Sequence, residues 1–252
     1  MRTFNKTILT IALASIAVPA FAADAPASDF ALTGNVSLIS DYRVRGISNT
    51  FKNPAIQGGF DVTHTSGLYV GTWASNVSSS WNPGANIETD WYGGYRGKIN
   101  DDLSYDVGGI YFYYPGSTMN PKEHTFDLYA SGTWKWINIK YSQDMTDYFG
   151  VADSKGTNYI EANVTVPLPA DITLVAHYGR QNNKGQNFVY DSGVSSSIDD
   201  WKIGVSKDMV GLTWSLAYLD TNKSITTDNG NTGGETKNIA GGSFIASVGK
   251  TF

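Results

Sequence analysis

The segment 36–46, VSLISDYRVRG, sets charged side chains at a regular interval among apolar ones. Asp41, Arg43 and Arg45 alternate with Tyr42 and Val44. A carboxylate and two guanidinium groups on one side of a segment attract or repel ions. No histidine accompanies them to serve as the base for a nucleophile. The pattern therefore indicates contact with water and dissolved ions.

A spacing of two residues is the side-chain period of a β-strand, whose successive residues point to opposite faces. Val36, Leu38, Tyr42 and Val44 would then share an apolar face opposite the charges. Two environments fit such a strand: a soluble sheet covering a core, or a membrane barrel with lipid outside and water inside. A charged substitution at Leu38 or Val44 would impair insertion of such a barrel.

The beginning of the chain predicts export. Basic residues precede an apolar run at 8–18, and a small-x-small site ends at Ala22, so residues 1–22 are predicted to be a cleaved signal peptide. The full sequence has net charge −5, and loss of Arg2 and Lys6 would make the mature chain, 23–252, more acidic. This acidity disfavours nucleic acid as a partner. The chain has no cysteine, so disulfides cannot support the exported fold.

Alternation along the remaining chain predicts an all-β protein: a single antiparallel up-and-down transmembrane barrel of about 12 strands of roughly ten residues each. Short periplasmic turns and longer polar extracellular loops alternate between the strands, which is typical of outer-membrane barrels. The strands are expected near 31–46, 54–64, 67–77, 86–98, 103–114, 123–135, 137–146, 157–167, 171–180, 198–207, 211–220 and 242–252.

The chain ends in SFIASVGKTF, with Phe244, Ala246, Val248 and Phe252 on one face. A terminal strand that closes with phenylalanine resembles the signal by which bacterial barrels are recognised for assembly. Lipid of the outer membrane and, through Phe252, the barrel-assembly machinery are therefore the expected partners. An exported soluble β-protein remains the alternative, although it has no reason to sort its loops by length.

Four segments carry a family resemblance: SDYRVRGIS at 40–48, 54–77, ETDWYGGYRG at 88–97, and 102–115. In these stretches the chain resembles the proteobacterial TorF family of porins. The resemblance covers nearly the whole mature chain and implies an outer-membrane barrel with a porin-like role in a Gram-negative cell. It implies no catalytic residues and no particular substrate.

Strand direction follows if both termini lie in the periplasm, as an even strand number requires. The lumen would then be acidic on the outer side, around an arginine pair, and basic on the periplasmic side, with a weak preference for cations. Small polar or charged solutes are the expected cargo. The predicted pore-lining residues are Asp41, Arg43, Arg45, Asp61, Glu88, Asp90, Arg96, Asp127, Lys135, Lys140, Asp144, Glu161 and Lys202.

Catalysis is not predicted, since no motif for a cofactor, metal or nucleophile is present. His64 is expected at a turn on the lipid side, His124 at the outer end of a strand, and His177 facing inward, each in a structural or interfacial role. Two functions remain open. The first is a passive diffusion channel through a narrow, charge-lined lumen. The second is a closed structural or adhesive barrel acting through loops 180–198 and 220–242.

Overall fold

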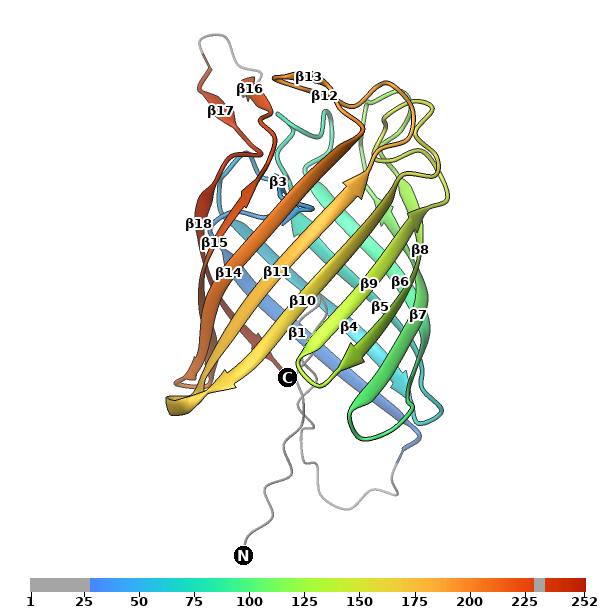
Figure 1. The fold of residues 1–252 in the computed structure, drawn as a ribbon, viewed down its shortest axis with the longest axis vertical. Helices are drawn as coiled ribbons and strands as arrows, with labels where there is room; N and C mark the ends of the chain where they lie inside the picture. Colours follow the sequence, from blue (N-terminus) through green and yellow to red (C-terminus); the bar gives the residue numbers. More distant parts are fainter. Residues whose placement is uncertain (1–27, 229–233) are drawn as a thin grey trace, which may run out of the picture.

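The protein is a closed antiparallel β-barrel of twelve strands. The computed structural model describes residues 28–228 and 234–252, so the predicted signal peptide at 1–22 lies outside the described residues. Figure 1 shows tilted strands enclosing a single lumen, with the longer connections at one end and the short ones at the other. We call these the loop end and the turn end.

The barrel strands follow one another around the wall in chain order, and β18 closes the ring against β1. At this seam the backbones of Gly34 and Phe252 exchange hydrogen bonds of 2.8 and 2.9 Å. The strands are β1 (Phe30–Ile39), β4 (Ala55–His64), β5 (Leu68–Asn76), β6 (Ile87–Lys98), β7 (Leu103–Tyr113), β8 (Thr125–Trp134), β9 (Ile137–Asp144), β10 (Asn158–Leu168), β11 (Ile172–Asn182), β14 (Ser197–Met209), β15 (Leu212–Thr221) and β18 (Ser243–Thr251).

Side chains alternate across the wall as the sequence pattern predicts, with apolar groups outside. In β4, Ile56 and Phe60 are 60% and 55% exposed, while Gln57 and Asp61 are buried inside. Trp91 and Trp134 are also more than half exposed on the outer surface. A folded chain that exposes so many large apolar and aromatic side chains is suited to contact with lipid.

The connections alternate in length, as expected. Five short turns at 65–67, 99–102, 135–136, 169–171 and 210–211 form the turn end. The loop end consists of L1 (40–54), L2 (77–86), L3 (114–124), L4 (145–157), L5 (183–196) and L6 (222–242). Three loops contain small hairpins: β2 (Arg43–Val44) with β3 (Ile47–Ser48), β12 (Val189–Tyr190) with β13 (Gly193–Val194), and β16 (Thr226–Asp228) with β17 (Thr236–Asn238).

The first predicted strand, 31–46, is too long at its loop end. β1 ends at Ile39, and the alternating residues that follow belong to L1, which turns into the lumen. The prediction that Tyr42 and Val44 face lipid is therefore wrong: Tyr42 is 4% exposed, and Val44 packs against a buried cluster. The remaining eleven predicted strands match barrel strands. The only helical segment among the described residues is the 3-10 turn Pro169–Asp171.

Candidate pore-lining site

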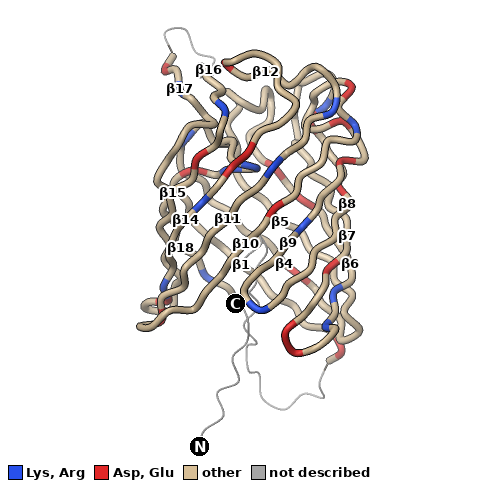
Figure 2. The backbone as a smooth tube through the Cα atoms, viewed as in Figure 1, with Lys and Arg blue, Asp and Glu red and all other residues tan. Residues whose placement is uncertain are grey.

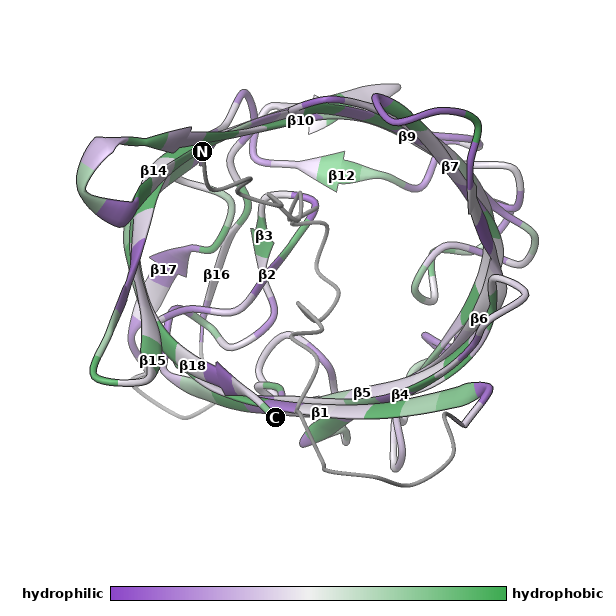
Figure 3. Cartoon of the chain, turned by 90° about the horizontal axis from the view of Figure 1, so that it is seen from below, coloured by the Kyte–Doolittle hydropathy of each residue, from purple (hydrophilic) through white to green (hydrophobic). Residues whose placement is uncertain are grey.

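L1 places the predicted arginines inside the barrel and off its wall. Seen along the barrel from the turn end, the β2–β3 hairpin lies within the ring of strands (Figure 3). Its two-residue turn is Arg45 and Gly46, with φ of 46° and 85°. Positive φ at both central residues is the geometry of a tight hairpin turn. The hairpin therefore projects a charged residue, Arg45, from its tip.

The root of the hairpin is fixed by Arg43, which is 6% exposed. Its Nε donates to Asp41 Oδ2 at 2.7 Å, and its remaining nitrogens donate to the carbonyls of Gly46 and Gly241 and to the hydroxyl of Ser243 at 2.9–3.0 Å. Asp41 also accepts a hydrogen bond of 2.5 Å from the Ser48 hydroxyl. Arg43 thus has its donors engaged beside the seam strand β18, and it holds the hairpin at that side of the lumen.

The tip reaches the opposite wall. Arg45 Nη2 donates to Asp127 Oδ2 on β8 at 2.7 Å, and Nη1 lies 3.5 Å from Asp144 Oδ1 on β9. Burial by itself lowers the pKa of the Arg45 guanidinium, but the two carboxylates raise it and the balance is upward. Arg45 therefore stays charged, and L1 spans the lumen from β18 to β8 and β9.

A further contact fixes the hairpin against the wall strands β14 and β15. A Cβ atom on Gly46 would lie 2.5 Å from Thr221 Cγ2 and 2.7 Å from Asp200 Cβ. Both the close packing and the positive φ therefore require glycine at this position.

We expect Gly46→Val to dislodge the hairpin without preventing the barrel from closing, because the wall strands keep their own hydrogen bonds. Limited proteolysis of the folded barrel would then cut L1 at least about tenfold faster than in the wild type, a factor that corresponds to about 1.4 kcal/mol. The matched control is Gly193→Val in the β12–β13 hairpin, where an added Cβ meets nothing within 4 Å. Equal L1 cleavage in the wild type and in Gly46→Val would contradict this packing role.

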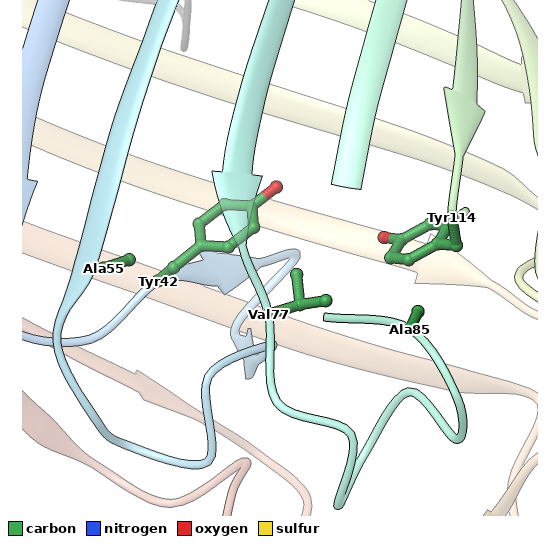
Figure 4. Close-up of a cluster of buried hydrophobic side chains, with 5 residues drawn as sticks. All are labelled: Tyr42, Ala55, Val77, Ala85 and Tyr114. Atoms are coloured by element: carbon green, nitrogen blue, oxygen red, sulfur yellow. The ribbon is translucent and has the colours of Figure 1, made fainter. Parts of the chain in front are cut away.

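On its other side L1 packs against L2, L3 and the start of β6. Figure 4 shows the hydroxyl ends of Tyr42 and Tyr114 pointing toward one another. Glu88, which is fully buried, accepts hydrogen bonds from the Tyr42 hydroxyl at 2.9 Å and from the Asn49 amide at 3.1 Å. Burial, followed by the charge of Glu88, raises the pKa of both tyrosines, so their hydroxyls stay protonated as donors.

The other predicted residues occupy several levels of the barrel. Asp61 and Asp90 are buried inside the wall, and Tyr92 donates to Asp61 at 2.8 Å. Toward the turn end, the Arg96 guanidinium lies 4.1 Å from the centre of the Tyr69 ring, and Lys140 Nζ lies 4.3 Å from that of Tyr129. The acidic wall residues nearer the loop end are visible in Figure 2.

Lys135 is placed differently from its prediction. It lies in the turn between β8 and β9, where φ is 53°, and its ammonium is 3.4 Å from Asp102. Both side chains are about half exposed, at 43% and 55%. The turn interrupts the two-residue alternation, which explains why the pattern assigned Lys135 to the lumen.

Glu161 and Lys202 belong to a network around His177 that sequence reasoning missed. His177 lies 2.9 Å from Asp200 and 2.7 Å from Asn163, and the Asn163 amide donates to Glu161 at 2.9 Å. Tyr159 also donates to Asp200, at 2.8 Å. His177 pairs with Lys202 in the register of β11 and β14. The side chain of His177 faces inward, as the sequence predicts. No local motif marks the network, since its members come from three strands, β10, β11 and β14.

The remaining histidines lie at the ends of the barrel, as expected. His64 borders a short turn and bonds Ser66, whereas His124 precedes β8 and accepts from the Tyr114 backbone. Within 28–228 and 234–252 no group of three or more His, Cys, Asp or Glu is arranged to hold a metal ion. None of the described helical segments has the length and apolar character of a membrane-spanning helix.

An apolar outer surface, a polar interior and an inward loop define the class as a porin-like β-barrel. The chain belongs to the family described as bacterial protein of unknown function (Gcw_chp), whose model matches residues 23–252. This match does not confirm the resemblance to the TorF family. No curated protein matches the chain.

Two similar solved structures are named as porins. The KdgM porin superimposes with a TM-score of 0.53 at 10% identity, covering 87% of this chain and 99% of that chain. The NanC porin has a TM-score of 0.52 at 14% identity, covering 88% and 98%. At these identities the similarity shows a shared fold.

Proposed function

We propose that the protein is a porin-like channel of the bacterial outer membrane, through which small polar or charged solutes diffuse passively. The observation that carries this proposal is the L1 hairpin, which crosses a polar lumen and narrows it at a level lined by buried charges. The fold shared with structures named as porins supports the same function.

The charge of the lumen favours cations. Its carboxylates outnumber the guanidinium groups of Arg43 and Arg45, and rings of acidic side chains attract cations. Each carboxylate belongs to a residue at most 5% exposed, so the surrounding protein screens it less than water would. The residues concerned are Asp41, Asp61, Glu88, Asp90, Asp127, Asp144 and Asp200.

The test is the current through the refolded mature chain in a planar bilayer under a potassium chloride gradient. We expect discrete current steps and a reversal potential that indicates preference for potassium. Asp61→Asn should lower the potassium-to-chloride permeability ratio about twofold, because it removes one inward charge while the amide oxygen still accepts from Tyr92. Asp102→Asn in a short turn is the control and should leave the ratio unchanged.

A specific observation also favours the second candidate, a closed barrel. Arg43 and Arg45 are held by partners on both sides of the lumen, so L1 resembles a fixed plug as much as a constriction. A folded wild-type barrel that passes no current would end the passive-channel proposal. In that case L5 and L6, at the loop end, would be the surfaces to examine for binding.

A further inference from the structure

The Arg45 head group occupies a built pocket of the barrel wall. We call it the guanidinium pocket, and it consists of Asp127, Asp144, Tyr148, Tyr159 and Gln181. Besides the two carboxylates, the rings of Tyr159 and Tyr148 lie with their centres 4.9 and 5.2 Å from Arg45 Cζ. Gln181 Oε1 accepts a hydrogen bond from Nη1 at 3.5 Å. Carboxylates bind a planar organic cation by charge-assisted hydrogen bonds, and aromatic faces bind it by cation–π contacts.

Most of the pocket belongs to the wall strands. Asp127, Asp144, Tyr159 and Gln181 come from the adjacent strands β8, β9, β10 and β11, and Tyr148 comes from L4. Asp127 and Asp144 face one another in the register of β8 and β9. The strand ladder therefore holds these four wall residues in place whether or not the tip of L1 is present, whereas Tyr148 lies in a cluster against which Ile47 of L1 packs.

Arg45 does not saturate the pocket. Two carboxylates surround one guanidinium, and burial makes an uncompensated charge costly. Among the described residues, Asp127 Oδ1 and both carboxylate oxygens of Asp144 are buried without a hydrogen bond, and Asp144 Oδ1 has only the ion-pair contact of 3.5 Å with Arg45. The pocket thus keeps acceptors for a cation that binds with better geometry than Arg45.

The hairpin tip is also a strained place for arginine. Arg45 has φ of 46°, a region that asparagine, aspartate and glycine adopt more readily than other residues. An unfavourable backbone conformation at a tip whose side chain enters a pocket points to a role for that side chain.

We propose that the guanidinium pocket is a binding site for organic cations that carry a guanidinium group, and that Arg45 fills it as an internal ligand. A solute with this head group competes with Arg45, and its binding releases the tip of L1. The site stands on the geometry of the wall and L4, so it does not depend on whether the barrel conducts.

Chemical complementation tests the site. Arg45→Ala empties the pocket, and we expect the refolded variant to unfold at a lower temperature than the wild type. Millimolar ethylguanidinium, which replaces the lost part of the side chain, should raise its melting temperature by several degrees, because a ligand that binds only the folded state stabilises it. Circular dichroism of the barrel in detergent measures this shift without any reference to current.

Two further variants make the result specific. Arg45→Ala with Asp127→Asn loses the carboxylate at 2.7 Å, and it should show no shift with ethylguanidinium. Arg45→Gln, a longer neutral side chain, serves if Arg45→Ala does not refold, and it should respond in the same direction. Urea and sodium chloride at equal concentration control for solvent and ionic strength. Equal shifts with ethylguanidinium and sodium, or an equal shift in the Asp127→Asn background, would overturn the proposal.

Conductance then separates this site from the proposed channel. A melting-temperature shift in a barrel that passes no current would uphold the guanidinium site and reject the channel. Current without any melting-temperature shift would uphold the channel and reject the guanidinium site.

Discussion

Replacing residues 43–48 with a Gly-Gly turn is expected to raise the single-channel conductance several-fold, because it removes the part of L1 that crosses the lumen. The deletion is compatible with the fold, since the backbone N–H of Asn49 already donates to the Tyr42 carbonyl at 2.8 Å and a two-residue turn joins such a pair. Planar-bilayer recordings of the wild type and the variant at equal salt concentration measure the change.

The matched control shortens another loop at the same end. Trimming L6 between Thr227 and Lys237, which pair in the β16–β17 hairpin, should leave conductance close to the wild-type value. Figure 1 shows this hairpin projecting away from the strands at the loop end. If both deletions changed conductance equally, or if the L1 deletion changed nothing, L1 would not be the constriction.

Leu38→Arg is expected to lower the fraction of the chain that folds into lipid vesicles, whereas Ser37→Arg should fold as the wild type does. Leu38 is 56% exposed on the outer surface, between Ile56 and Val248 of the neighbouring strands. An arginine facing lipid costs about 2 to 4 kcal/mol near the middle of the bilayer and less toward its edges, and Leu38 is one residue before the end of β1. Ser37 faces the lumen, where a charged side chain remains in contact with water.

Heat-modifiable migration on a gel measures the folded fraction of both variants. Equal folded fractions for Leu38→Arg and Ser37→Arg would mean that the outer surface of β1 does not contact lipid. Val44→Arg does not test contact with lipid, although the sequence predicted that it would, because Val44 packs inside the barrel.

The alternation of side chains was enough to predict the barrel. Along β10, Ile160 and Val164 face outward, whereas Tyr159, Glu161 and Asn163 face inward. Lipid outside and water inside select apolar and polar residues in turn, so the alternation can be read from the sequence. The pattern in β5 was ambiguous because Trp73 faces inward, where it packs against Tyr42 of L1 with ring centres 5.3 Å apart.

L1 shows where this reasoning fails. A hairpin inside the lumen alternates just as a wall strand does, so Asp41, Arg43 and Arg45 were recognised as charges inside the barrel but were assigned to its wall. Their partners were not predictable in the same way. Tyr148 lies in L4 and Gln181 on β11, and only closure of the barrel brings either of them next to Arg45.

The bridging position of L1 has a consequence for the order of assembly. Arg43 bonds Ser243, 200 residues away in the chain, and Arg45 bonds Asp127, 82 residues away. Such distant partners are brought together only after the intervening strands have paired and β18 has joined β1. L1 follows the first strand of the barrel, yet it takes its position across the lumen only once the last strand has joined.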